Sequence, residues 1–157
     1  MKKFSLLLRF LMLILVSLSL PLAADDVEDF LQLDPLPDGV VFEIVESAED
    51  DLEFLLPRVR DFIERVRVRA PEVEFAVVSH GREEFALQTS KQVEYADIHN
   101  QVQSLVSDDV PVHVCETHAG WYGVTVEDFP DYVDVAPTGP GQIRLYEELG
   151  FHLVVIE

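Results

Sequence analysis

The sequence predicts an α/β fold, a three-layer α/β/α sandwich around a mainly parallel five-stranded sheet. Short and nearly continuous apolar runs recur along the chain, and such runs are typical of strands that are buried on both faces. Segments with a helical period of apolar residues separate them, and this alternation favours parallel strands joined by helices. The 157 residues fit a single domain with one buried core, and the chain contains no internal repeat.

Residues 1–24 have the three-part layout of a secretory signal peptide, so we expect them to be removed from the mature protein. Lys2, Lys3 and Arg9 form a basic start, an almost unbroken apolar run follows over residues 10–20, and small residues come next. The apolar run is shorter than the roughly 20 residues that span a bilayer, which favours cleavage near residue 24 over an uncleaved anchor. The prediction is a periplasmic or secreted protein that has no membrane attachment after cleavage.

Residues 25–39 are acidic, contain two prolines and show no sustained period, so we expect a leading segment of irregular structure on the surface. The domain itself is expected over residues 40–157, and residues 40–45 form its first strand. Ser47 and Asp50 match a capping box before a long helix, and Pro57 either kinks that helix or lies in its first turn. The helix has one apolar face, built at steps of three and four by Leu52, Leu55, Leu56, Val59, Phe62, Ile63 and Val66.

The rest of the chain continues the alternation of strands and helices. A second helix is expected over residues 92–107, where apolar residues again share one face. Gly139-Pro140-Gly141 opens a final helix, because proline is favoured in a first helical turn, and Gly150 ends it. The remaining strands are expected at residues 73–79, 111–115, 132–135 and 151–156, with a short turn or helical piece at 127–130.

The chain is strongly acidic, and this charge excludes nucleic acid as a partner. Its formal net charge is −19, and removal of the three basic residues within 1–24 lowers it by three to −22. A polyanion would be repelled at every approach. The simplest interpretation of the thirty carboxylates is a soluble, solvated surface.

Cys115 is the only cysteine and the first candidate for chemistry. Export leads to an oxidising compartment where cysteines normally pair, so a single one is buried in the core, paired between chains or chemically used. Cys115 stands where the third expected strand ends and a turn-rich segment with Gly120 and Gly123 begins. Ligands of open α/β sheets bind at the carboxyl ends of strands, so this position favours a functional thiol over a packing role.

Two histidines are candidate helpers of Cys115. His118 follows three residues later, and His80 ends the second strand, so both could face one crevice with the thiol if the two strands are neighbours. Glu116 opposes a reactive thiol, since a nearby carboxylate favours its neutral form. Zinc or copper bound by Cys115, His118 and His80 is an alternative, for which a fourth ligand is missing.

Other unusual residues have simpler interpretations. His113 lies within a strand, where histidine is more often a hydrogen-bonded core group. Trp121 and Tyr122 line a pocket, form an oligomer contact or belong to the core. The Gly-Pro-Gly turn lacks the spacing of a phosphate-binding loop or a dinucleotide fingerprint, so we expect no cofactor. The sequence shows neither a Ser/His/Asp arrangement nor a paired-carboxylate site with defined spacing.

The chain resembles the DsrE/DsrF-like family over residues 40–156. The resemblance is carried by Val-His-Val-Cys-Glu-Thr-His-Ala-Gly at 112–120, Glu-Asp-Phe-Pro at 127–130, and Pro-Thr-Gly-Pro-Gly-Gln-Ile at 137–143 before Leu-Gly-Phe at 149–151. It implies a small α/β domain with a five-stranded parallel sheet that assembles into homo-oligomers. It also implies a sulfur relay, in which one cysteine accepts sulfur as a persulfide and passes it to a partner, and Cys115 is the position that resembles this cysteine. Characterised relay members are cytoplasmic, whereas this chain carries an export signal, so their partners do not carry over.

The leading hypothesis is an exported sulfur-binding or sulfur-carrier protein with Cys115 as carrier thiol and His118, together with His80, as helpers. A thiolate attacks a sulfane sulfur, holds it as a persulfide and releases it by the same exchange, which needs one accessible cysteine and no second one in the chain. Its partner would be a sulfur donor or acceptor protein or a small thiol. Two alternatives remain: a non-catalytic oligomeric binding module in which Cys115 is buried, and a metal-binding protein that uses Cys115 and His118.

Overall fold

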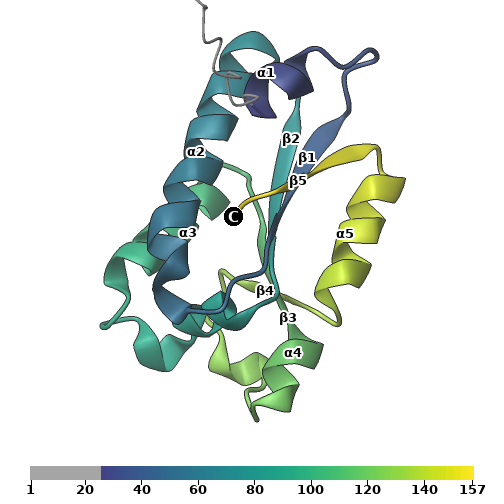
Figure 1. Ribbon diagram of the computed structural model, residues 1–157. Coiled ribbons are helices and arrows are strands. Elements are labelled where there is room, and N and C mark those ends of the chain that lie inside the picture. The colour runs from purple at the N-terminus through teal and green to yellow at the C-terminus, as the bar shows by residue number, and fades with distance from the viewer. Residues whose placement is uncertain (1–25) are drawn as a thin grey trace, which may run out of the picture.

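The protein forms three layers around a five-stranded parallel sheet, as predicted (Figure 1). The computed structural model describes residues 26–157, and the expected signal peptide lies outside these residues. The strand order across the sheet is β4-β3-β2-β1-β5. The strands are β1 (Gly39–Ile44), β2 (Glu74–Ser79), β3 (Val112–Cys115), β4 (Asp134–Ala136) and β5 (Phe151–Val155).

Helices cover the two faces of the sheet unequally. Helices α1 (Asp26–Leu31), α2 (Leu52–Arg69) and α3 (Ala96–Ser107) lie on one face, and α5 (Gly139–Glu148) lies on the other (Figure 1). The short helix α4 (Glu116–Trp121) continues directly from the carboxyl end of β3. Among the described residues, no helix has the length and apolar character that crossing a membrane requires. The remaining helical pieces are the 3₁₀ turns η1 (Glu49–Asp51), η2 (Arg82–Leu87), η3 (Thr89–Lys91) and η4 (Val126–Asp128).

The three central strands, β1, β2 and β3, are buried on both faces because each face is covered. On β1, Val40, Phe42 and Ile44 belong to the large core beneath α2 and α3, whereas Val41 belongs to a smaller cluster with Ile143 of α5. Successive side chains of a strand point to opposite faces, so an unbroken apolar run supplies both cores at once. Burial on both faces is the physical reason for the continuous apolar runs that predict the sheet.

The beginning of α2 differs from the predicted capping arrangement. The expected capping box at Ser47 and Asp50 is wrong by one residue, because the Asp51 carboxylate accepts the hydrogen bond of the Ala48 backbone N–H at 2.9 Å. Pro57 lies inside α2 at an exposed position, and Glu53, the residue whose carbonyl loses its helical hydrogen bond, is exposed as well. The helix therefore tolerates proline without burying an unpaired backbone group.

Two segments expected to be irregular are helical. Residues 26–31 form α1, and Phe30 is buried with its ring centroid 5.9 Å from that of Phe62 on α2. Residues 116–121 form α4 instead of the expected turn-rich segment, and Gly123 with its positive φ of 76° follows that helix. Each helix has only six residues, too few to display a sustained helical period in the sequence.

Candidate functional site

The candidate site lies at the carboxyl edge of the sheet, where β3 passes into α4. Strands β2 and β3 are neighbours, as the predicted crevice requires. Cys115 is the last residue of β3 and the N-cap of α4, and its Sγ accepts a hydrogen bond from the His118 backbone N–H at 3.3 Å. The Cys115 side chain is buried, with only 4% of the residue surface exposed.

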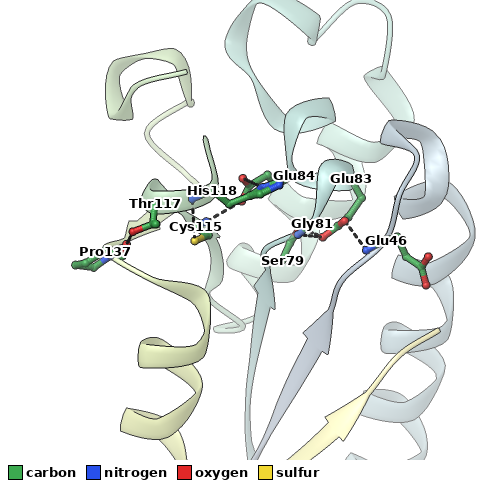
Figure 2. Close-up of polar contacts among 9 residues, drawn as sticks. All are labelled: Glu46, Ser79, Gly81, Glu83, Glu84, Cys115, Thr117, His118 and Pro137. Atoms are coloured by element: carbon green, nitrogen blue, oxygen red, sulfur yellow. Dashed lines mark hydrogen bonds and ion pairs between the residues drawn. The ribbon is translucent and has the colours of Figure 1, made fainter. Parts of the chain in front are cut away.

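His118 lies beside Cys115, as the sequence predicted, but its imidazole is held by a residue from elsewhere. Nδ1 of His118 is 2.8 Å from Oε1 of Glu84, which belongs to η2 (Figure 2). The ring stacks on Phe85 with a centroid separation of 5.3 Å, and the rings of Trp121 and Tyr122 approach it edge-on. These contacts define both the position and the plane of the imidazole.

Glu84 is the central residue that sequence reasoning missed. Its side chain is fully buried, its Oε2 accepts the Cys115 backbone N–H at 2.8 Å, and its Oε1 meets His118 (Figure 2). Burial raises the pKa of Glu84 from 4.5 to about 7, against the lowering effect of the hydrogen bonds from Cys115 and His118. In the sequence, Glu84 looks like one more surface carboxylate of an acidic chain. Its only signal is its position shortly after the carboxyl end of a buried strand.

Glu83, the preceding residue, is also fully buried but makes contacts with the scaffold. Its Oε1 accepts hydrogen bonds from Ser79 Oγ at 2.7 Å and from the Gly81 N–H at 3.0 Å. Its Oε2 accepts the Glu46 N–H at 2.7 Å (Figure 2). The Glu83 carboxylate thereby ties the segments that follow β1 and β2 to η2, which carries Glu84.

His80 directly follows Ser79, which pairs with Val114 across β2 and β3, and its imidazole is held by a residue of a third strand. Its Nε2 is 2.8 Å from Oε1 of Glu43 on β1, so the ring is engaged by the neighbouring strand. A Cβ placed on Gly139 would lie 2.5 Å from His80 Cβ, which means that α5 begins in close contact with this histidine. Among residues 26–157, no group of three or more His, Cys, Asp or Glu side chains is arranged to hold a metal ion. The alternative metal site of Cys115, His118 and His80 is therefore not assembled.

Glu116 is next to Cys115 in the chain but is not the carboxylate that is bonded to it. Glu116 is exposed and lines an open groove, whereas the carboxylate hydrogen-bonded to Cys115 and His118 is that of Glu84. The groove has a volume of about 710 Å³ and lies along α4. Trp121 lines it with 75% of its surface exposed, so this residue is not part of the core.

Two further histidines have structural roles. His113 lies within β3, as expected for a hydrogen-bonded core group, and its Nε2 is 2.8 Å from the Tyr146 hydroxyl. Burial lowers the pKa of His113. The Nε2–H of His99 donates to the Ala86 carbonyl oxygen at 2.9 Å, and burial lowers the pKa of His99 as well. Both histidines join helices to other elements of the fold.

Comparison with family models and with curated proteins gives no match. Two solved structures share the fold. A protein of unknown function from Methanobacterium thermoautotrophicum superposes with a TM-score of 0.60 at 22% identity, over 74% of this chain and 96% of that one. A conserved protein of unknown function from Bacteroides thetaiotaomicron gives a TM-score of 0.50 at 9% identity, over 74% and 94% of the two chains. At such identities the likeness concerns the fold alone, and the resemblance to the DsrE/DsrF-like family stays a prediction.

Proposed function

We propose that this protein is an exported sulfur carrier that holds a persulfide on Cys115, with His118 as the group that accepts and returns the proton. One observation carries the proposal: a single buried carboxylate, Glu84, contacts both the Cys115 backbone and the His118 imidazole. Buried carboxylate–imidazole pairs with a shifted pKa are concentrated at functional sites. A packing role for the only cysteine requires no such pair beside it.

The transfer balances without an external oxidant or reductant. The Cys115 thiol gives its proton to the free nitrogen of His118, and the thiolate attacks the outer sulfur of a donor persulfide, R–S–SH. A bond forms between Cys115 Sγ and that sulfur, the donor S–S bond breaks, and its electron pair leaves on the donor thiolate. His118 then returns the proton to the donor, so the products are the Cys115 persulfide and R–SH. Release to an acceptor thiolate is the same exchange in reverse.

The burial of Cys115 means that the site must open before a donor reaches Sγ. Helix α4 is the element that moves in this proposal, because it is short and follows the thiol directly. It is tied down at Thr117, whose N–H and Oγ1 both donate to the Pro137 carbonyl oxygen. In an exported homo-oligomer of the DsrE/DsrF-like type, a donor or acceptor protein or a small thiol would approach from this side.

Intact mass spectrometry after incubation with a persulfide donor tests the proposal. The wild-type protein should gain about 32 Da, the mass of one sulfur atom, and Cys115→Ser should not. His118→Gln should gain it more slowly, whereas His152→Gln, a change of an exposed histidine on β5, should behave as wild type. A wild-type protein that gains no Cys115-dependent sulfur would overturn the proposal.

A second candidate function is a non-catalytic binding module. The burial of Cys115, together with the groove beside α4 and the exposed Trp121, favours it. In that case iodoacetamide would modify Cys115 of the native protein only at the rate of global unfolding. A carrier would be alkylated much faster, since opening of α4 alone exposes the thiol. Measuring alkylation and unfolding rates on one sample separates the two functions.

A further inference from the structure

The two oxygens of Glu84 face partners of different kinds. Oε2 is bonded to the Cys115 backbone N–H, which can only donate. Oε1 is bonded to Nδ1 of His118, which donates when it carries a proton and accepts when it does not. A proton on the Glu84 carboxyl therefore has a hydrogen-bond acceptor when it lies on Oε1 and points at Nδ1.

This geometry links the charge of Glu84 to the state of the other imidazole nitrogen. When Glu84 is ionised, its Oε1 accepts from Nδ1–H, and Nε2 of a neutral His118 is free to accept a proton. When the pair holds one proton more, either Glu84 donates to Nδ1 or both imidazole nitrogens are protonated. Nε2 carries a proton in both of these arrangements. Uptake of one proton by the pair thus turns Nε2 from an acceptor into a donor.

We propose that Glu84 is a positioning residue that selects the His118 tautomer, so that Nε2 is the proton acceptor of the site when Glu84 is ionised. One part of the inference rests on the proposed function: that Nε2 takes the proton of the Cys115 thiol and returns it to the leaving thiolate. The selection of the tautomer is a property of the pair itself.

The surroundings of Glu84 support a switch near neutral pH. Glu83 raises the pKa of Glu84 through its charge, and the hydrogen bonds from the Cys115 N–H and from His118 lower it. Burial is the largest effect; it outweighs the two hydrogen bonds and brings the Glu84 pKa to about 7. Arg82, also on η2, lies over the Tyr122 ring at 5.6 Å, and Tyr122 in turn contacts the His118 ring. Phe85, on the same 3₁₀ turn, stacks on the imidazole with an angle of 20° between the two ring planes.

Glu84→Gln is the informative substitution because it keeps the shape of the side chain but replaces one acceptor oxygen with an NH₂ group that can only donate. The single carbonyl oxygen of glutamine would accept the Cys115 N–H, so the amide NH₂ would face Nδ1 of His118. His118 would then carry its proton on Nε2 and could not act as the acceptor. Glu116→Gln is the matched control, because it makes the same chemical change at an exposed carboxylate that lies between Cys115 and His118 in the sequence.

Nitrogen-15 NMR of protein labelled in histidine reads the tautomer directly, without any sulfur donor. Above pH 7 the wild type and Glu116→Gln should have the proton on Nδ1 of His118, and Glu84→Gln should have it on Nε2. In the wild type, lowering the pH through about 7 should add a proton to Nε2, and this titration tests the inference even if Glu84→Gln does not fold. A wild-type proton on Nε2 above pH 7, or the same tautomer in Glu84→Gln, would overturn the inference.

The rate of iodoacetamide alkylation gives an independent readout of the acceptor role. At pH 8, Glu84→Gln should react roughly 10- to 100-fold more slowly than the wild type, and its rate should lose the inflection near neutral pH. An unchanged alkylation rate in Glu84→Gln would show that Nε2 of His118 does not accept the proton of the Cys115 thiol. Neither the NMR measurement nor the alkylation rate involves a persulfide, so failure of the sulfur-loading test would not overturn this inference. Likewise, failure of this inference would not overturn the proposed sulfur loading of Cys115.

Discussion

Glu83 and Glu84 are consecutive residues with fully buried side chains, and they hold different parts of the molecule. Glu83 accepts three hydrogen bonds, from the last residue of β2 and from the segments that follow β1 and β2, and Glu84 contacts Cys115 and His118. Both lie in η2, and successive side chains of a 3₁₀ turn point about 120° apart. The same turn therefore anchors itself to the scaffold through one carboxylate and presents the next to the site.

Replacement of Glu83 should strongly destabilise the fold. Glu83→Ala leaves Ser79 Oγ and the N–H groups of Gly81 and Glu46 without their acceptor. We expect a loss of about 3 kcal/mol or more in the free energy of unfolding, measured by urea denaturation. Glu72→Ala, a change of an exposed carboxylate, should alter it by less than about 0.5 kcal/mol. Equal stabilities for the two variants would contradict the anchoring role.

Glu84 should make the protein less stable as the pH rises from about 5 to 7. Its pKa is raised from 4.5 to about 7, so over this range the folded protein holds a proton that the unfolded chain has released. The free energy of unfolding then falls with pH, by at most about 1.4 kcal/mol per unit for one proton. Glu84→Gln should remove this contribution, which is measured as the difference in slope between variant and wild type. The idea fails if the two slopes coincide between pH 5 and 7.

Helix α1 should contribute to the stability of the domain through Phe30. The ring is buried against Phe62 and lies 5.9 Å from the His152 ring. Phe30→Ala should lower the free energy of unfolding by about 3 to 5 kcal/mol in thermal or urea denaturation. Leu33→Ala, just beyond α1 at an exposed position, should cost far less. A loss of similar size for both would mean that α1 does not dock as described.

Two Gly→Ala substitutions should have opposite effects because their surroundings differ. A Cβ at Gly139 would come within 2.5 Å of His80, so Gly139→Ala should displace the start of α5 and cost about 1 to 3 kcal/mol. A Cβ at Gly120 would meet nothing within 4 Å, and this glycine lies inside α4. Gly120→Ala should stabilise that helix by up to about 1 kcal/mol, because alanine has the higher helix propensity. Thermal unfolding of both variants checks the pair.

The sequence predicted the position of the site better than its contents. Cys115 ends β3 and His118 lies next to it, as expected from an apolar run followed by a Cys-x-x-His spacing. His80 was expected in the same crevice, and its imidazole bonds Glu43, a residue 37 positions away in the chain. No local pattern encodes such a partner, because the pairing depends on which strands become neighbours.

By itself, the sequence determined the layers and the order of strands and helices, because burial on one or two faces leaves a local period in the chain. It also determined that the only thiol stands at a strand end. Tertiary structure alone decided that a carboxylate joins the site. Glu84 is separated by 31 residues from Cys115 and by 34 from His118. The fold of η2 brings the fully buried Glu84 side chain to both of them. The burial that removes this carboxylate from solvent also raises its pKa to about 7, so that it can gain or lose a proton near neutral pH, unlike a surface carboxylate.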